Sequence, residues 1–343
     1  MLFLPTSLIL IGYSAATFIY LLQNLKKKID KRLFLNELTL VLLFFISGFL
    51  YPFMYQSHSD SISILTLNVL WAISSFIFIV EMVVWGFVLR YNASISKRNP
   101  KIMAQRDYND YIQQVYARWD ESIKSEFGRK ILHLFTCSVI FIFWTLGTIL
   151  EFNGFLSLFG LDNYSFSHWL IVTTGFVFVF MFQIADLVRL NRYYMLPNWA
   201  RKWYLSMRPE ETETFIASTP LVLSFVPFIF TPFPIFGAVA IITTGADALA
   251  CIIGKKYGTH QLRKNSKKTL EGFLAGGIST FIVVIVILNL YYYLMPVAII
   301  KIYLMALSSS GMFLIIDYFS ISISDNVLNP LLTGLVMWII YII

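Results

Sequence analysis

Long apolar runs separated by short polar segments dominate the pattern of this chain. Runs of about 20 residues recur along its whole length, and a helix of that length crosses a bilayer. The pattern therefore predicts about ten membrane spans. The predicted spans are residues 4–23, 34–53, 62–89, 131–150, 166–188, 215–232, 234–253, 272–294, 297–318 and 327–343.

Composition agrees with a membrane protein. Hydrophobic residues make up 58% of the 343 positions and charged residues 13%, whereas soluble domains contain about 25% charged residues. In addition, the basic segment "KKKIDKR" follows the first apolar run, while a cleaved signal peptide carries its charges in front. The first run is therefore predicted to stay as a helix. The expected fold class is all-α, a polytopic integral membrane helical bundle.

The basic residues predict how the spans are oriented. Of the 26 lysines and arginines, 25 lie in four polar segments, 24–33, 90–130, 189–214 and 254–269. Ten spans place all four segments on one side, and basic loops mark the cytoplasmic side. Both termini are then expected on the non-cytoplasmic side. The membrane would be the plasma membrane in a prokaryote or the endoplasmic reticulum in a eukaryote.

Ionisable residues inside predicted spans are candidates for function. Each costs at least about 2.5–3.5 kcal/mol near the bilayer centre. His133, Asp186, Asp247 and Asp317 are all expected in the cytoplasmic half, and Lys301 is the exception. A polar cavity open to the cytoplasm would gather these side chains at one depth. Structural salt bridges remain the alternative interpretation.

Two of these positions have basic neighbours at helical spacing. Glu126, the pair Arg129 and Lys130, and His133 are three or four residues apart, so one helix face presents them all. Asp186 and Arg189 share a face in the same way. For Asp186 and Arg189, an ion pair within the helix is the simpler alternative.

The segment "GADALACIIGKKYGTHQLRKNSKKTLEG" (residues 245–272) places an acid in an apolar run and lysines directly after it. Backbone N–H groups, lysines and a helix N-terminus bind phosphates. Asp247 would hold Mg²⁺, which prefers one or two carboxylates together with phosphate oxygens. The sequence therefore predicts a nucleotide site. The alternative for the lysines alone is the positive-inside rule or attraction to anionic lipid.

These residues resemble a known family. "GADALACIIGKKYG" followed by "KKTLEG" is similar to the nucleotide-site signature of the CTP-dependent lipid kinases, which act on dolichol or polyprenol, phytol or diacylglycerol. "EFGRKILH", "ADLVRL" with "RPEETETF", and "DNVLNP" resemble further elements of that family in the same order. One departure is Ala246, which separates Gly245 from the acid. The resemblance predicts a kinase-like domain at 125–343, preceded by a three-helix region with a polar segment at 1–124.

The resemblance implies transfer of the γ-phosphoryl group of CTP, with Mg²⁺, to a lipid alcohol at the cytoplasmic leaflet. The expected partners are CTP, the alcohol (polyprenol, phytol or diacylglycerol) and membrane lipids, without nucleic acid. The alternatives are a phosphatidate cytidylyltransferase-like enzyme, which shares the "KKTxEG" stretch, and a non-enzymatic transporter or structural membrane protein. The candidate residues are His133, Asp186 and Glu271 for catalysis; Gly254, Lys255, Lys256, Gly258, Lys267, Lys268, Thr269 and Gly272 for the nucleotide; Asp247, Asp325 and Asn326 for the metal; and Glu126, Arg129, Lys130, Arg189 and Asp317 as further polar groups.

Overall fold

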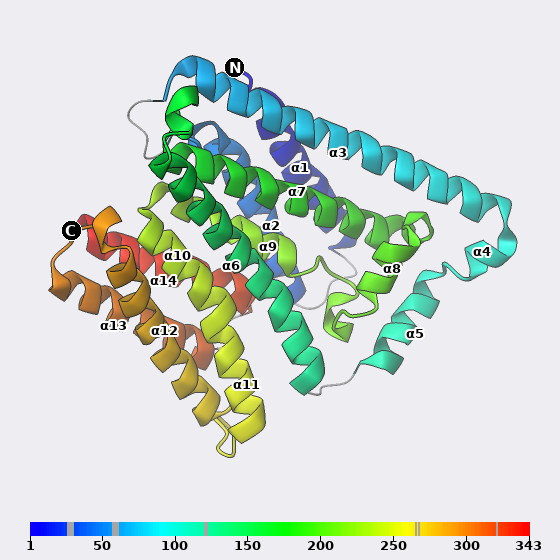
Figure 1. Cartoon of the computed structure of the whole chain (residues 1–343). Coiled ribbons are helices and arrows are strands. Elements are labelled where there is room, and N and C mark those ends of the chain that lie inside the picture. Colours follow the sequence, from blue (N-terminus) through cyan, green and yellow to red (C-terminus); the bar gives the residue numbers. More distant parts are fainter. Residues whose placement is uncertain (26–30, 57–61, 120–122, 265, 267, 320–321) are drawn as a thin grey trace. The chain divides into compact units, whose positions relative to one another are not determined.

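The computed structural model describes residues 1–25, 31–56, 62–119, 123–264, 266, 268–319 and 322–343, and for residues 31, 123–132 and 210 the backbone alone. Within these residues the regular structure is helical (Figure 1). Nine helices there are long and apolar enough to cross a membrane. The chain is therefore an all-α, multi-pass membrane protein, as the pattern predicted. The nine are Leu4–Asn24, Arg32–Phe53, Ile64–Arg98, His133–Phe152, Asn163–Met195, Phe233–Tyr257, Leu270–Leu290, Ile299–Phe319 and Asp325–Ile342.

The sixth predicted span, residues 215–232, is not a long helix. The short helix α9 (Ser218–Ser224) and the 3-10 turn η5 (Val226–Phe230) take its place. Pro227 lies at the start of η5, and a proline has no N–H to continue the α-helical ladder. The apolar helix that results, Ser218–Phe230, is shorter than a full span. The sixth of the roughly ten expected spans is therefore shorter than predicted, and each of the other nine has a counterpart among the described residues.

The chain divides into two compact units. Unit 1 consists of Met1–Pro52, Leu67–Asp120 and Val172–Pro220. Unit 2 consists of Phe53–Thr66, Glu121–Ile171 and Leu221–Ile343. Val172–Pro220 thus groups by packing with the N-terminal helices. The division into residues 1–124 and 125–343, which the resemblance in sequence implies, stays a prediction.

Unit 1 is built from long apolar helices and a set of short polar ones. The N-terminal pair packs side by side, and the Ser14 hydroxyl donates to the Val41 carbonyl oxygen at 2.9 Å. The long third helix ends at Arg98, and the side chain of the next residue, Asn99, accepts the Lys101 N–H and caps the following helix. Its helices are α1 (Leu4–Asn24), α2 (Lys31–Leu50), most of α3 (Ile64–Arg98), α4 (Pro100–Ala104), α5 (Tyr108–Arg118), α7 (Asn163–Arg192) from Val172 onward, and α8 (Asn198–Tyr204).

Unit 2 holds the remaining helices, and its C-terminal helices follow one another as packed neighbours. The Trp144 ring stacks on Phe233 with centroids 3.7 Å apart. The Ser310 hydroxyl donates to the Gly277 carbonyl oxygen at 2.7 Å and joins two spans. The helices are α6 (Ile123–Phe152), α10 (Phe233–Ile241), the π turn η6 (Ile242–Ala246), α11 (Asp247–Tyr257), α12 (Leu270–Leu290), α13 (Ile299–Phe319) and α14 (Asp325–Ile342).

Candidate functional site

The basic segment between α11 and α12 folds back on itself. The Leu262 N–H donates to the Lys268 carbonyl oxygen at 2.9 Å, and the Leu270 N–H donates to the His260 carbonyl oxygen at 2.9 Å. Gln261 and Thr269 form an antiparallel bridge between these two bonds. Backbone hydrogen bonds between residues 260–262 and 268–270 therefore close the loop that was predicted from the sequence to hold phosphates.

Glu271 fastens this loop to the first turn of α12. Its Oε1 accepts the Thr259 N–H at 3.1 Å and the Thr259 hydroxyl at 2.8 Å, and it lies 2.8 Å from His260 Nδ1. The structure gives Glu271 a clear function in holding the loop. Its expected catalytic function stays a prediction.

The glycines of the motif bring two helices together. A Cβ atom on Gly272 would lie 2.7 Å from the Ala250 carbonyl oxygen and 2.9 Å from Gly254 Cα, so α11 and α12 touch through their backbones. Thr269 caps α12, since its hydroxyl accepts the Gly272 N–H at 3.3 Å. These glycines were expected to let the backbone come close to a phosphate. In the structure, Gly254 and Gly272 let the backbones of α11 and α12 come close to each other.

Lys268 joins three parts of unit 2. Its ammonium donates to Asp317 Oδ1 at 2.6 Å and to Asp325 Oδ2 at 3.2 Å. Asp247 lies near enough to Asp325 for the negative charges of the two carboxylates to repel each other. The side chains of Lys268, Asp317 and Asp325 are 30%, 18% and 36% exposed, so the cluster is half-buried and open to solvent. Four candidates that the sequence took from separate stretches are therefore brought together.

The carboxylates determine the charge of this lysine. Burial would lower the pKa of Lys268, but Asp325 and Asp317 outweigh that effect, and the pKa lies above its usual range. Lys268 is therefore a permanent cation at neutral pH. It lies between two carboxylates and balances part of their negative charge.

The fit to Mg²⁺ depends on a nucleotide. Within the described part of the chain, no group of three or more His, Cys, Asp or Glu side chains is arranged to hold a metal ion. Mg²⁺ does not require such a cage, because it is usually bound by one or two carboxylates and substrate phosphates. Asp247 and Asp325 meet that lower requirement. Asn326 follows at the start of α14 and is buried, with its N–H donating to the Ser324 hydroxyl at 3.3 Å.

A π turn precedes Asp247. The Asp247 N–H donates to the Ile242 carbonyl oxygen, five residues earlier. Such turns occur mostly as single interruptions of α-helices and are frequent at functional sites. Thr243 and Thr244 in this turn are buried, and their hydroxyls donate to carbonyl oxygens one turn back at 2.8 Å.

Asp186 and Arg189 form a second polar cluster, inside unit 1. Arg189 Nε donates to Asp186 Oδ1 at 3.0 Å, and both side chains are fully buried. Asp186 Oδ2 accepts the Ile216 N–H at 2.7 Å, and the remaining guanidinium nitrogens donate to the carbonyl oxygens of Thr212 and Thr214. The pair therefore anchors the segment after α8, and both Asp186 oxygens are engaged.

The other candidates lie in different surroundings. His133 is buried in α6, with 5% of its surface exposed. Lys255 and Lys256 are exposed at the end of α11. The side chains of Glu126, Arg129 and Lys130 lie outside the described residues, as does Lys267.

Two carboxylates within the predicted spans were not among the candidates taken from the sequence. Glu37 in α2 is 1% exposed, and its Oε1 accepts the Thr214 hydroxyl at 3.3 Å. Glu81 lies within the apolar helix α3, and its Oε2 is buried. The signal that singled out Asp186, an acid inside an apolar run, would have found both.

No family model, no curated protein and no solved structure matches this chain.

Proposed function

We propose that this chain is a CTP-dependent kinase that phosphorylates the hydroxyl of a membrane lipid alcohol of the dolichol or polyprenol type at the cytoplasmic leaflet. One observation carries the proposal. Lys268 of the "KKTLEG" stretch contacts Asp325 of the "DNVLNP" stretch, and Asp325 interacts with Asp247 of the "GADALACIIG" stretch. Stretches that resemble one family in sequence thus meet in space.

The charges of this cluster suit a nucleotide triphosphate. Phosphoryl transfer requires mainly positioning and neutralisation of negative charge. Lys268 supplies a permanent cation, and the exposed ammonium groups of Lys255 and Lys256 lie at the end of α11. Because the loop from 258 to 269 is already held by Glu271, little of its order would have to form on binding.

Asp247 and Asp325, with Asn326 beside them, would hold Mg²⁺ together with the phosphates. When bound, the ion would supply positive charge to the transferred phosphoryl group. Asp317 would take over the ammonium of Lys268, to which it already lies closer than Asp325 does.

The reaction forms a bond between the γ-phosphorus and the alcohol oxygen and breaks the bond to the bridging oxygen of CDP. The hydroxyl proton must pass to a base. Asp186 is poorly suited to that function, because its two oxygens already accept hydrogen bonds from Arg189 and Ile216. Of the two candidates from the sequence, we therefore assign the proton to His133.

The experiment is a transfer assay with the purified full chain, Mg²⁺ and CTP labelled in the α or the γ phosphate. The acceptors are polyprenol, dolichol, phytol, diacylglycerol and phosphatidic acid, each tested separately. Label from the γ phosphate in an extracted alcohol supports the kinase and identifies its substrate. Label from the α phosphate in the lipid would show that the protein is a cytidylyltransferase instead of a kinase. If the protein is folded and transfers neither label, a transporter or scaffold is favoured.

Two variants show whether the activity belongs to this site. Asp247→Asn should lose transfer while the protein stays folded, since Asp247 is half-exposed. Lys264→Gln is the control, because Lys264 is exposed in the same loop and outside the cluster. Equal activity of wild type and Asp247→Asn would contradict the assigned site.

A further inference from the structure

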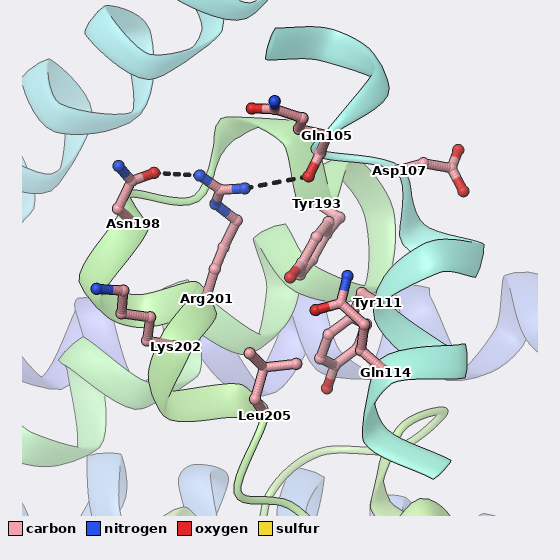
Figure 2. A pocket seen from close by; sticks show the side chains of 9 residues that line it. All are labelled: Gln105, Asp107, Tyr111, Gln114, Tyr193, Asn198, Arg201, Lys202 and Leu205. Carbon is pink, nitrogen blue, oxygen red and sulfur yellow. Dashed lines mark hydrogen bonds between the residues drawn. The ribbon is translucent and has the colours of Figure 1, made fainter. Parts of the chain in front are cut away.

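A polar cavity of about 270 Å³ lies within unit 1. Its wall comes from α5, α8 and the turns next to them, and it shares no residue with the proposed nucleotide site (Figure 2). A cavity of this size holds a small polar group, and most of its lining side chains are polar. They are Gln105, Asp107, Tyr111, Gln114, Tyr193, Asn198, Arg201, Lys202 and Leu205.

Arg201 brings a positive charge to this cavity without a countercharge. Its guanidinium donates to the Gln105 carbonyl oxygen at 3.4 Å and to Asn198 Oδ1 (Figure 2). Its Nε is buried and makes no hydrogen bond within the described chain. Burial lowers the pKa of Arg201, and Tyr193 acts in the opposite direction. No described carboxylate lies in ion-pair contact with this guanidinium.

A second guanidinium adds to the positive potential. Arg106 is 7% exposed, and its Nη1 donates only to neutral oxygens, among them the Ser96 hydroxyl at 2.8 Å and the Tyr194 carbonyl oxygen at 3.1 Å. Burial, and then the charge of Arg201, lower the pKa of Arg106. Arg106 is buried and Arg201 is partly buried. Buried charges in proteins are normally paired, so an anion beside these two arginines would supply the countercharge that their neutral partners do not.

The other lining groups strengthen this requirement. The ammonium of Lys202 and the side-chain amide of Gln114 make no hydrogen bond within the described residues, and both are able to donate one. The one acid of the lining, Asp107, caps α5 by accepting the Asn109 and Asp110 N–H groups. Figure 2 shows its carboxylate pointing away from Arg201. The cavity is therefore positive and rich in donors.

Two tryptophans of α8 place the cavity near a membrane surface. Trp199 and Trp203 are 54% and 45% exposed. Their rings pack on Trp85 of α3 and Phe182 of α7, with centroids 5.8 and 5.7 Å apart. Tryptophan gathers at the level of lipid headgroups, where one end of the side chain is apolar and the other is wet. A cavity at that level would be within reach of lipid phosphates and of soluble solutes.

We propose that this cavity binds a phosphate group, held by Arg201 and Lys202, which belongs either to an anionic lipid headgroup or to a soluble phosphate monoester. A guanidinium matches phosphate oxygens with two parallel N–H donors, and an ammonium adds a point charge. The proposal is independent of the kinase function, since none of its residues belongs to the proposed nucleotide site.

The test measures binding of two labelled probes to the full chain reconstituted in phosphatidylcholine nanodiscs. One probe is phosphatidic acid, and the other is glycerol 3-phosphate in solution. Arg201→Gln should weaken binding about tenfold or more, because it removes a charge-assisted hydrogen bond. Lys202→Gln should weaken it about fivefold and breaks no hydrogen bond of the structure. Arg118→Gln and Lys97→Gln, at exposed cations of unit 1 outside the cavity, should bind as wild type does.

The proposal is supported if either probe binds saturably and if the affinities of the variants fall in the expected order. The probe that binds shows whether the phosphate belongs to a lipid or to a soluble molecule. Lys202→Gln decides the matter on its own if Arg201→Gln fails to fold. The proposal is overturned if neither probe saturates, if the cavity variants bind as wild type does, or if the two control variants lose as much affinity as the cavity variants.

Discussion

Lys268 Nζ lies 2.6 Å from Asp317 Oδ1, although 49 residues separate them in the chain. The contact ties the loop before α12 to the end of α13. Asp325, at the start of α14, shares the same ammonium at 3.2 Å. Three helix ends of unit 2 are thus connected by one side chain.

A double-mutant cycle on this pair should reveal strong coupling. Lys268→Met leaves Asp317 and Asp325 without their shared cation, and we expect a clear loss of stability. Asp317→Asn in the same chain should restore part of it, with a coupling free energy of about 0.5–3 kcal/mol. The measurement is thermal or denaturant unfolding in detergent, with the exposed Lys264→Met as control. Additive effects of the two changes would contradict the contact.

The same lysine predicts a dependence on alkaline pH. Its pKa is raised in the folded protein because Asp325 and Asp317 outweigh the effect of burial. Its contribution to stability is therefore complete below the ordinary lysine pKa of about 10.4 and is lost as the pH rises through the raised value. The difference in unfolding midpoint between wild type and Lys268→Met should stay constant from neutral pH to about pH 10 and shrink above it. A difference that shrinks towards acidic pH instead, well above the carboxylate range, would be inconsistent with this linkage.

Gly272→Ala should destabilise the contact between α11 and α12. The added methyl group would meet the Ala250 carbonyl oxygen at 2.7 Å, so the helices would have to separate. We expect a loss of about 1–3 kcal/mol. Gly311→Ala in α13 is the matched control, because a Cβ there has nothing within 4 Å, and alanine favours a helix. Equal stability of the two variants would show that the backbones are not in contact.

Asp186→Asn should act on folding. The change removes the charge that balances a fully buried Arg189, and breaking one side of such a pair costs about 3–5 kcal/mol. Asp110→Asn, at an exposed carboxylate of unit 1, should change stability by at most about 1 kcal/mol. Unfolding in detergent measures both. A folded Asp186→Asn protein that is as stable as wild type but inactive would return Asp186 to the list of proton acceptors.

The basic segments are expected on one side of the membrane. Single cysteines placed at Lys101, Lys202 and Lys264, after replacement of Cys137 and Cys251, should react with an impermeant maleimide from the same side. A cysteine at Asn153, in the loop between α6 and α7, should react from the other side. This result requires that the short helix Ser218–Phe230 returns the chain across the membrane. Labelling of Lys202 and Lys264 from opposite sides would show that it does not.

The sequence predicted best what depends on neighbours along the chain. Nine spans follow from runs of apolar residues, and the ion pair of Asp186 and Arg189 follows from their spacing of three. The sixth span failed because Pro227 interrupts a run that is apolar enough to mislead a hydropathy count. The contacts of the candidate site were harder to predict, because the partners of Lys268 and Arg189 come from distant segments. No local pattern of residues specifies which carboxylate or carbonyl oxygen these side chains will bind.

Some candidate residues also have a structural function that the sequence did not predict, for the same reason. Gly254 and Gly272 have the composition of a phosphate loop, but packing of α11 on α12 explains them already. Glu271 has the position of a catalytic acid, yet its bonds to Thr259 and His260 hold a loop. Residue type reports which chemistry is possible, and only the fold reports which partner is within reach.

The π turn Ile242–Ala246 determines how a change of one residue in this segment would affect the helix after it. A turn closed between residues five apart contains one residue more than the α-helical turn it replaces. Without that wider turn, one inserted residue would rotate everything after it by about 100° and carry Gly254 away from Gly272. Ala246 lies in this turn, at the place where the sequence departs from the pattern it resembles. Loss of one codon here would therefore return the turn to α-helical geometry and leave Gly254 facing Gly272.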